Sequence, residues 1–187
     1  MTNDTDEEVA RRVQAGDPDA FGVLIERYQA KLMRYARKFL LDPDDAVDIV
    51  QDIFIKTYEN IQSFDATRRF SPWIYRIAHN EFVNALKKRS ASRTIFAFDI
   101  DTLFPHLAAE ETADSVSLEG DLRRTLEGHL EELDAKYREP LVLYYLESMD
   151  YKEISEILQI PVSTVGVRLA RARAMLKKIA GTDTNLL

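Results

Sequence analysis

The stretch that most constrains the fold is a pair of helical patterns separated by a break, at residues 150–178 (DYKEISEILQIPVSTVGVRLARARAMLKK). The first pattern spans 151–158, and its apolar positions share one helical face: Ile154, Ile157 and Leu158. The sequence Gln-Ile-Pro at 159–161 interrupts the pattern, and we expect Ser163 to cap a second helix. A short helix, a tight turn and a longer helix are typical of a helix-turn-helix.

The second helix of this pair has an apolar stripe and a basic face. The stripe follows helical spacing and consists of Val165, Leu169, Ala172, Leu176 and Ile179. Thr164, Arg168 and Arg171 lie together on another face. Because the second helix of a helix-turn-helix enters the DNA major groove, the pattern indicates DNA binding. A helical hairpin with a solvated basic face is the alternative that this stretch alone leaves open.

Composition narrows the class of protein. The 187 residues suffice for one or two small domains, and the long segments with helical period favour an all-α fold. The chain has no cysteine, which excludes disulfides and cysteine-based zinc sites. The three histidines, His79, His106 and His129, do not have metal-ligand spacing. We therefore expect no metal and no cofactor.

Charge and hydropathy indicate where the protein works and with what. No apolar run approaches the roughly 20 residues that span a bilayer, and the acidic start MTNDTDEEVARR is unlike a signal peptide. These features predict a cytoplasmic protein without membrane insertion. The net charge is −7, although residues 168–178 contain five basic residues and no acid. A basic DNA-reading helix on an acidic body indicates a partner that holds the chain on DNA.

Two helices are predicted in the N-terminal part, at 21–40 and 44–61, after the start signals Asp-Pro-Asp at 17–19 and at 42–44. The apolar stripe of the first is Leu24, Tyr28, Leu32, Tyr35 and Phe39, and that of the second is Val47, Val50, Phe54, Tyr58 and Ile61. The second helix also carries an acidic ridge, formed by Asp45, Asp48 and Asp52 with Gln51 beside them. The ridge is either a solvated face or a docking site for a basic protein.

A loop at 60–72 precedes a further helix at 72–88, for which Ser71 and Pro72 provide a start signal. One surface of this helix combines aromatic, amide and basic side chains: Trp73, Arg76, Asn80, Asn84, Lys87, Lys88 and Arg89. Aromatic rings stack on bases, while basic groups hold phosphates, so this combination suits single-stranded nucleic acid. The alternative is that Trp73 and Phe70 are ordinary core residues.

The acidic segment 91–120 shows no sustained period and is expected to be a flexible linker. Helices are predicted at 121–133 and 138–148, with Pro140 in the first turn of the second. The predicted fold is all-α, with two small helical bundles joined by the linker. The C-terminal bundle contains the helix-turn-helix.

Four stretches resemble one known family: DPDAFGVLIERY at 17–28, DAVDIVQDIFIKTY at 45–58, FSPWIYRIAHN at 70–80, and LDAKYREPLVLYYLESMDYKEISEILQIPVSTVGVRLARAR at 133–173. In this order they resemble the extracytoplasmic-function (group IV) sigma factors of bacterial RNA polymerase. The resemblance implies a region 2-like domain at 1–90, the linker at 91–120 and a region 4-like domain at 121–187. It also implies a promoter-recognition and DNA-opening factor that is not an enzyme.

The resemblance assigns roles to residues. The minus-ten element would be held by Phe64, Trp73, Arg76, Asn80, Asn84, Lys87, Lys88 and Arg89. The minus-thirty-five element would be read by Ser163, Thr164, Val167, Arg168 and Arg171, with Arg173 and Lys177 on phosphates. Docking on the polymerase would use Asp48, Gln51, Asp52 and Phe54. The implied partners are core RNA polymerase, through its β′ coiled coil and β flap, promoter DNA and an anti-sigma factor.

Some positions depart from the family pattern. Gln159 stands where relatives often have Gly, and a left-handed backbone would cost a non-Gly residue roughly 1 kcal/mol there. Gly166-Val167 replaces Lys-Ser, and Asn84 replaces Asp. The N-terminal autoinhibitory region of larger sigma factors is missing, so we expect regulation by a separate protein.

Two other functions were considered. A helix-turn-helix regulator that acts as a dimer would bind a palindromic site, but the sequence shows no evident dimer helix. An enzyme of nucleic-acid metabolism would need a phosphate-binding loop, a metal cluster or a nucleophile with its base, and none is apparent.

Overall fold

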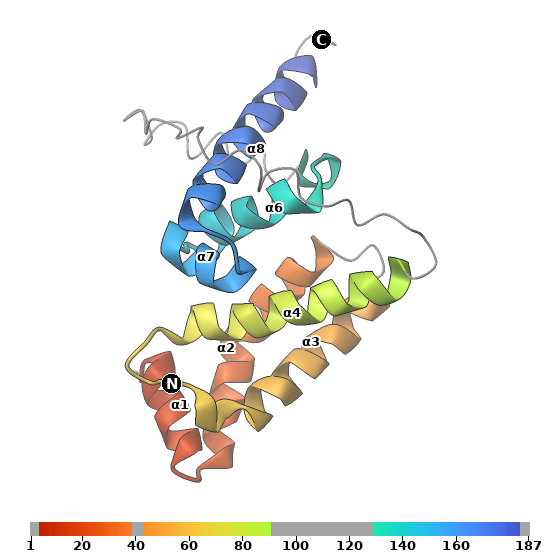
Figure 1. Ribbon diagram of the computed structural model, residues 1–187. Coiled ribbons are helices and arrows are strands. Elements are labelled where there is room, and N and C mark those ends of the chain that lie inside the picture. The colour runs from red at the N-terminus through yellow and green to blue at the C-terminus, as the bar shows by residue number, and fades with distance from the viewer. Residues whose placement is uncertain (1–3, 39–42, 91–128, 184–187) are drawn as a thin grey trace. The chain divides into compact units, whose positions relative to one another are not determined.

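The computed structural model describes residues 4–38, 43–90 and 129–183, and these residues form helices only (Figure 1). The chain divides into two compact units, Met1–Phe96 and Ala97–Leu187. The all-α prediction is thus confirmed. The predicted linker at 91–120 and most of the helix predicted at 121–133 lie outside the described residues.

Unit 1 contains α1 (Asp6–Gln14), η1 (Pro18–Ala20), α2 (Phe21–Arg37), α3 (Pro43–Glu59), η2 (Ile61–Ser63) and α4 (Phe70–Ser90). α2 packs against α3, α3 packs against α4, and α1 contacts both α2 and α4. Tyr35 is fully buried, and its ring lies edge-on to Tyr75 and Phe82, at centroid distances of 5.2 and 5.0 Å. Such aromatic pairs contribute about 0.5–1.5 kcal/mol beyond their buried area, so this cluster joins α2 firmly to α4.

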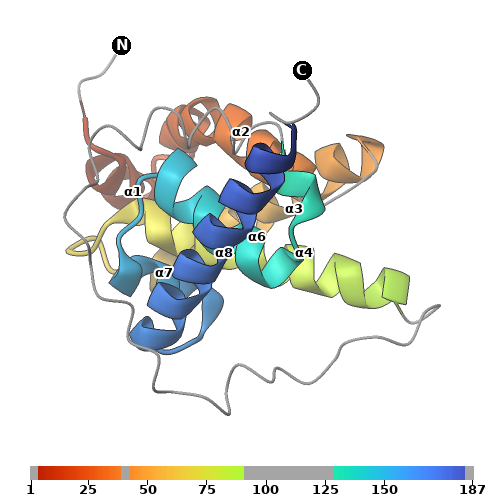
Figure 2. The same ribbon diagram turned by 90° about the horizontal axis from the view of Figure 1, so that it is seen from above.

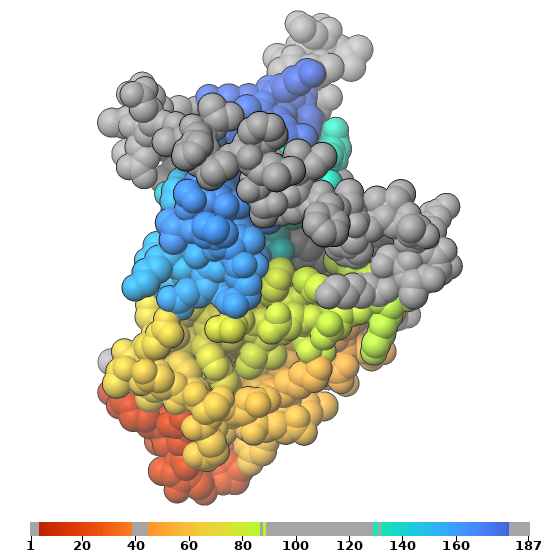
Figure 3. Space-filling view, viewed as in Figure 1, coloured from red at the N-terminus to blue at the C-terminus, as the bar shows by residue number. Residues whose placement is uncertain are grey.

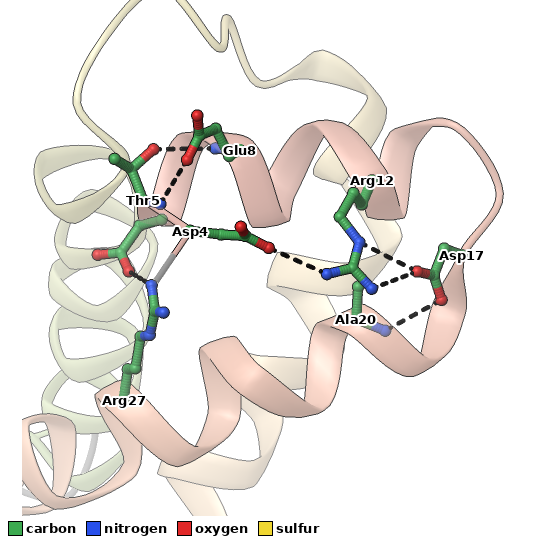
Figure 4. Close-up of polar contacts among 8 residues, drawn as sticks. Asp4, Thr5, Glu8, Arg12, Asp17, Ala20 and Arg27 are labelled. Carbon is green, nitrogen blue, oxygen red and sulfur yellow. Dashed lines mark hydrogen bonds and ion pairs between the residues drawn. The ribbon is translucent and has the colours of Figure 1, made fainter. Parts of the chain in front are cut away.

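Both ends of α1 are fixed by side chains (Figure 4). Thr5 and Glu8 form a capping box, in which each side chain hydrogen-bonds the backbone N–H of the other. At the other end, the Arg12 guanidinium donates to Asp17 at 2.7 Å, and this hydrogen bond holds the pKa of Asp17 below its ordinary value. Asp17 also accepts from the backbone N–H of Ala20 and so caps η1. These bonds fix the turn between α1 and α2.

The buried face of α3 differs from the predicted stripe. The buried positions are Ala46, Val50, Ile53, Phe54 and Thr57. Val47 and Tyr58, which were expected in the core, are 43% and 45% exposed. The Thr57 hydroxyl donates to the carbonyl oxygen of Ile53 at 2.6 Å, so a polar residue occupies the core face without loss of hydrogen bonding. The prediction, which used apolar residues alone, therefore placed the buried face of α3 incorrectly.

The start of α4 also differs from prediction. The helix begins at Phe70 instead of 72, so Ser71 is not its N-cap and Pro72 is not its first residue. The backbone N–H of Phe70 donates instead to the carboxylate of Glu7 on α1, at 2.8 Å. A side chain distant in sequence thus satisfies an N–H that a helix start leaves without an intrahelical partner.

Unit 2 contains η4 (Leu130–Glu132), α6 (Ala135–Leu141), the π-helix η5 (Val142–Leu146), α7 (Tyr151–Leu158) and α8 (Val162–Asp183). Both α6 and α7 pack against α8, as the two ribbon views show (Figures 1 and 2). The predicted stripe of α8 is confirmed: Val165, Leu169, Ala172 and Leu176 are buried, and Ile179 is half-buried.

The helices before the helix-turn-helix depart from prediction. Leu133 has an extended backbone, so the helix predicted to reach residue 133 does not extend that far. The next helix begins at Ala135, where Asp134 accepts from the backbone N–H of Lys136. Pro140 therefore lies inside α6 and not in a first turn. Because proline lacks an N–H, it removes an i to i−4 bond, and the backbone continues as a π-helix directly afterwards.

The helix-turn-helix is confirmed at α7, with the predicted bounds Tyr151–Leu158. Asp150 and Glu153 form a capping box at its start, and Gln159 at its end is left-handed, with φ of 56°. Ser163 does not cap α8, because that helix begins at Val162 and its first hydrogen bond runs from Val165 N–H to the Pro161 carbonyl.

We expect Gln159→Gly to stabilise unit 2 by about 1 kcal/mol, because glycine adopts positive φ without a steric cost. Hydrogen exchange of the α7 and α8 amides would measure the gain. Gln159→Ala is the matched control, since it removes the same side chain but keeps the strained backbone. Equal protection in the two variants would contradict this explanation.

Candidate functional site

α4 forms part of the surface of unit 1 (Figure 3), and a row of polar side chains runs along this helix. Arg76, Asn80, Asn84 and Lys88 are exposed and follow one another at intervals of four residues. Trp73, one turn before them, is partly exposed. The core positions of the same helix are Phe70, Ile74, Tyr75, Ala78 and Phe82. The structure thus brings these predicted residues to one face, whereas the side chains of Lys87 and Arg89 lie outside the described part.

Phe64 is not on this surface. It is only 5% exposed, and its ring packs against the rings of Phe70 and Trp73, at centroid distances of 5.2 and 5.1 Å. In this structure the ring of Phe64 shares one cluster with the rings of Phe70 and Trp73, and its role at the minus-ten element stays a prediction. Phe64 instead supports Trp73 from below.

The turn before α4 is polar and ordered by its own side chains. Asp65 accepts from both the backbone N–H and the hydroxyl of Thr67, at 3.0 and 2.7 Å. The backbone hydrogen bond is the main reason that the pKa of Asp65 is lowered. Arg68 and Arg69 follow directly and are exposed. This turn adds basic side chains beside the α4 row.

A second surface lies on α3. Asp48, Gln51 and Asp52 are exposed, as predicted, but Phe54 is only 8% exposed and packs edge-on to Phe21. The burial of Phe54 agrees with its place in the predicted apolar stripe, and its role in polymerase docking stays a prediction.

The sequence interpretation missed apolar residues on the same α3 surface. Ile55 is 55% exposed and lies beside Asp52 and Glu59 at spacings of three and four residues. Together with the exposed Val47 and Tyr58, it makes the surface both acidic and apolar, a combination that favours protein binding. The signal was in the sequence, since Ile55 is an apolar residue that falls outside the predicted stripe.

A third surface lies on α8. Ser163 and Lys177 are exposed, and the remaining accessible positions are partly exposed: Thr164, Val167, Arg171 and Arg173. Arg168 is only 7% exposed, so in this structure its side chain does not lie on the outer face, and its role in reading DNA stays a prediction. Helical spacing set Arg168 beside Thr164 and Arg171, but its position is close enough to the apolar stripe for its long side chain to be buried in the unit.

Tyrosines surround the middle of α8. Burial of the Arg173 guanidinium acts to lower its pKa, but the neighbouring Tyr145 and Tyr151 outweigh this effect, so that the pKa of Arg173 is raised. Tyr144 packs edge-on against both tyrosines, at centroid distances of 4.8 and 5.5 Å. A Cβ atom added to Gly166 would lie 3.7 Å from the Tyr151 ring, which is an ordinary contact. A residue with a Cβ atom would therefore fit at position 166 without a clash with the Tyr151 ring.

The described residues contain no group of three or more histidine, cysteine or acidic side chains that could hold a metal ion. No helix in the described part of the chain is long and apolar enough to cross a membrane.

The polar side chains of unit 1 and unit 2 form elongated surfaces along helices, and such surfaces suit an extended partner.

Comparisons with known proteins place both units in known families. Residues 24–92 match the family Sigma-70 region 2, and residues 123–176 match Sigma-70, region 4. The chain is 35% identical to the ECF RNA polymerase sigma factor SigW of Bacillus subtilis, over 90% of this chain and 92% of that protein.

Two solved structures are similar over most of the chain. CnrH in complex with the cytosolic domain of CnrY gives a TM-score of 0.68 at 29% identity, covering 96% of this chain and 99% of that chain. The sigma factor RpoE of Bartonella quintana, in complex with the anti-sigma factor NepR, gives 0.65 at 26% identity, covering 87% and 98%. With its region 2 and region 4 matches, this chain belongs to the ECF family of RNA polymerase sigma factors, which direct promoter recognition at transcription initiation.

Proposed function

We propose that this sigma factor works in the cytoplasm as a non-catalytic subunit of RNA polymerase, and that it contacts promoter DNA at two points. The domains would be residues 1–90 for polymerase docking and the minus-ten element, 91–120 as linker, and 121–187 for the minus-thirty-five element. The observation that carries the proposal is the α4 row, in which Trp73, Arg76, Asn80, Asn84 and Lys88 share one accessible face. Sigma factors as a family are transcription factors and not enzymes.

The α4 row is suited to hold an opened minus-ten strand. Trp73 offers a ring for base stacking, which is worth about 1–3 kcal/mol per base. Asn80 and Asn84 can hydrogen-bond base edges, while Arg76 and Lys88 hold phosphates. Unstacking a base costs a few kcal/mol, so stacking and phosphate contacts together can offset the cost of opening. Lys87 and Arg89 extend the basic character of this helix in sequence.

The α8 surface is suited to read the minus-thirty-five element in duplex DNA. Ser163, Thr164 and Arg171 can contact base edges, and Val167 can contact a thymine methyl group. The partly exposed Arg173 and the exposed Lys177 are suited to phosphates. Arg168 is buried beneath this surface, so a base contact by Arg168 requires its side chain to move outward.

The α3 surface is suited to dock on core polymerase. Asp48 and Asp52 supply charge for a basic partner, and the exposed Ile55 supplies apolar area beside them. We assign this surface to the β′ coiled coil, and unit 2 to the β flap.

Regulation by a separate anti-sigma factor fits the comparisons. RpoE of Bartonella quintana was solved with the anti-sigma factor NepR, and CnrH with the cytosolic domain of CnrY. We propose that a protein of this kind holds the present chain away from polymerase.

Reversing one charge on α3 tests the docking assignment. We expect Asp52→Lys to weaken binding of core polymerase at least about tenfold in a pull-down, because a cation then faces a basic partner. Asp19→Lys on η1 is the matched control, since Asp19 is also exposed and the charge change is the same. Circular dichroism would show that both variants keep their helix content. Unimpaired binding by Asp52→Lys would rule out the assignment.

Promoter binding by the isolated chain tests the proposed function. We expect fluorescence anisotropy to show weak binding of a labelled promoter fragment by the chain alone, since the chain carries a net charge of −7. Added core polymerase should tighten specific binding at least about tenfold, because docking adds a second set of contacts. Tight, sequence-specific binding without polymerase would instead favour an independent dimeric regulator.

A further inference from the structure

One face of α1 carries three polar residues at spacings of four and three positions: Glu7, Arg11 and Gln14. Each of them bonds a backbone group in residues 61–70, which we name the recognition segment. This segment connects α3 to α4 and lies beside α1 in the ribbon view (Figure 1). The three residues therefore form a brace between the first helix and the segment that leads to Trp73.

Gln14 makes the strongest part of the brace. Its side-chain amide donates to the carbonyl oxygens of Ile61 at 2.7 Å and Phe64 at 2.8 Å. In return, the side-chain amide of Gln62 donates to the Gln14 carbonyl at 3.2 Å. Gln14 is partly buried, and two carbonyls that face a buried position need donors. One side chain thus fixes both ends of the turn that places Phe64 under the Trp73 ring.

The other two residues extend the brace along the segment. The Arg11 guanidinium donates to the carbonyl oxygen of Ala66 at 3.3 Å. The Glu7 carboxylate accepts from Phe70 N–H at 2.8 Å, where α4 begins. The backbone groups that α1 bonds are thus distributed over the whole segment from residue 61 to residue 70. The side chains of Thr67, Arg68 and Arg69 remain exposed.

Two other polar residues of α1, Arg12 and Asp6, bond elsewhere in unit 1 and provide a contrast. Arg12 donates to Asp4, which precedes α1, and to Asp17, which follows it, so its bonds join the two ends of α1. Asp6 accepts from Arg27 and Tyr28 on α2. Helix α1 is therefore attached to the unit by one set of bonds, while a separate stripe holds the recognition segment.

We infer that Glu7, Arg11 and Gln14 are positioning residues for minus-ten selectivity: they hold the recognition segment in the shape that receives an unstacked base of the non-template strand. This inference rests on the proposed function of the α4 row. A segment that is already ordered loses less entropy on binding and tolerates fewer alternative bases. Loss of the brace should thus lower discrimination between sequences more than it lowers total affinity for DNA.

The test uses holoenzyme assembled from core polymerase and the full chain. The probe is forked promoter DNA whose non-template strand carries a short randomised single-stranded stretch at the minus-ten position. Sequencing of bound and unbound DNA gives the enrichment of preferred sequences. The variants are Gln14→Met and Arg11→Met, which remove donors from the brace, and the matched control is Arg12→Met, which removes donors from the same helix but outside the brace.

We expect Gln14→Met to lower the enrichment about tenfold, since two hydrogen bonds of ordinary net strength are lost. Arg11→Met should lower it less, and its exposed position keeps the unit folded. Arg12→Met should keep the wild-type enrichment, and all three should bind core polymerase normally. The inference is overturned if both brace variants select as the wild type does, or if Arg12→Met loses as much. If the wild-type holoenzyme itself selects no sequence, the proposed function fails instead.

Discussion

The packing of Phe70 is the interaction on which unit 1 depends. Its ring is fully buried and packs against the Tyr28 ring on α2, at a centroid distance of 5.5 Å. It also packs against the rings of Phe64 and Trp73. Its backbone N–H is held by Glu7 on α1. One residue thus joins the first helix, the second helix and the start of α4. Because the α4 row begins one turn later, the direction of that whole surface is set where Phe70 is fixed.

The strength of these links is uneven. The Tyr28 hydroxyl donates to Asp6 at 2.6 Å, and burial, followed by this hydrogen bond, raises the pKa of Tyr28. A partly buried bond of this kind contributes about 1.5–3 kcal/mol because its acceptor is charged. The Arg12–Asp17 ion pair is exposed and contributes at most about 1 kcal/mol. The partly buried hydrogen bond from Tyr28 to Asp6 therefore contributes more to the position of α1 than the exposed Arg12–Asp17 ion pair does.

The sequence alone predicted the features that depend on local patterns. The bounds of α7, the buried stripe of α8 and the polar row of α4 follow from helical spacing, and the structure has them. The left-handed residue at 159 was also suspected, because a tight turn between helices commonly requires one. Membership of the sigma factor family was recognised from the order of four short stretches, and the comparisons confirm it.

Features that depend on distant residues could not be predicted in this way. The burial of Phe64 and Arg168 is decided by which neighbours their long side chains meet across the unit. The brace of α1 uses side chains that bond backbone atoms of the recognition segment far along the chain, and no local motif marks such bonds. The buried face of α3 was misplaced because Thr57 satisfies its hydroxyl within the helix.

The central claim is that the chain gives core polymerase a choice of promoters through two DNA-binding surfaces and one docking surface. Run-off transcription of a genomic fragment library, with the start sites mapped, tests this claim most directly. The account predicts a defined set of start sites when the chain is added to core polymerase, with shared sequence elements about 10 and 35 base pairs upstream, one for each surface. Start sites that are the same with and without the chain would contradict it.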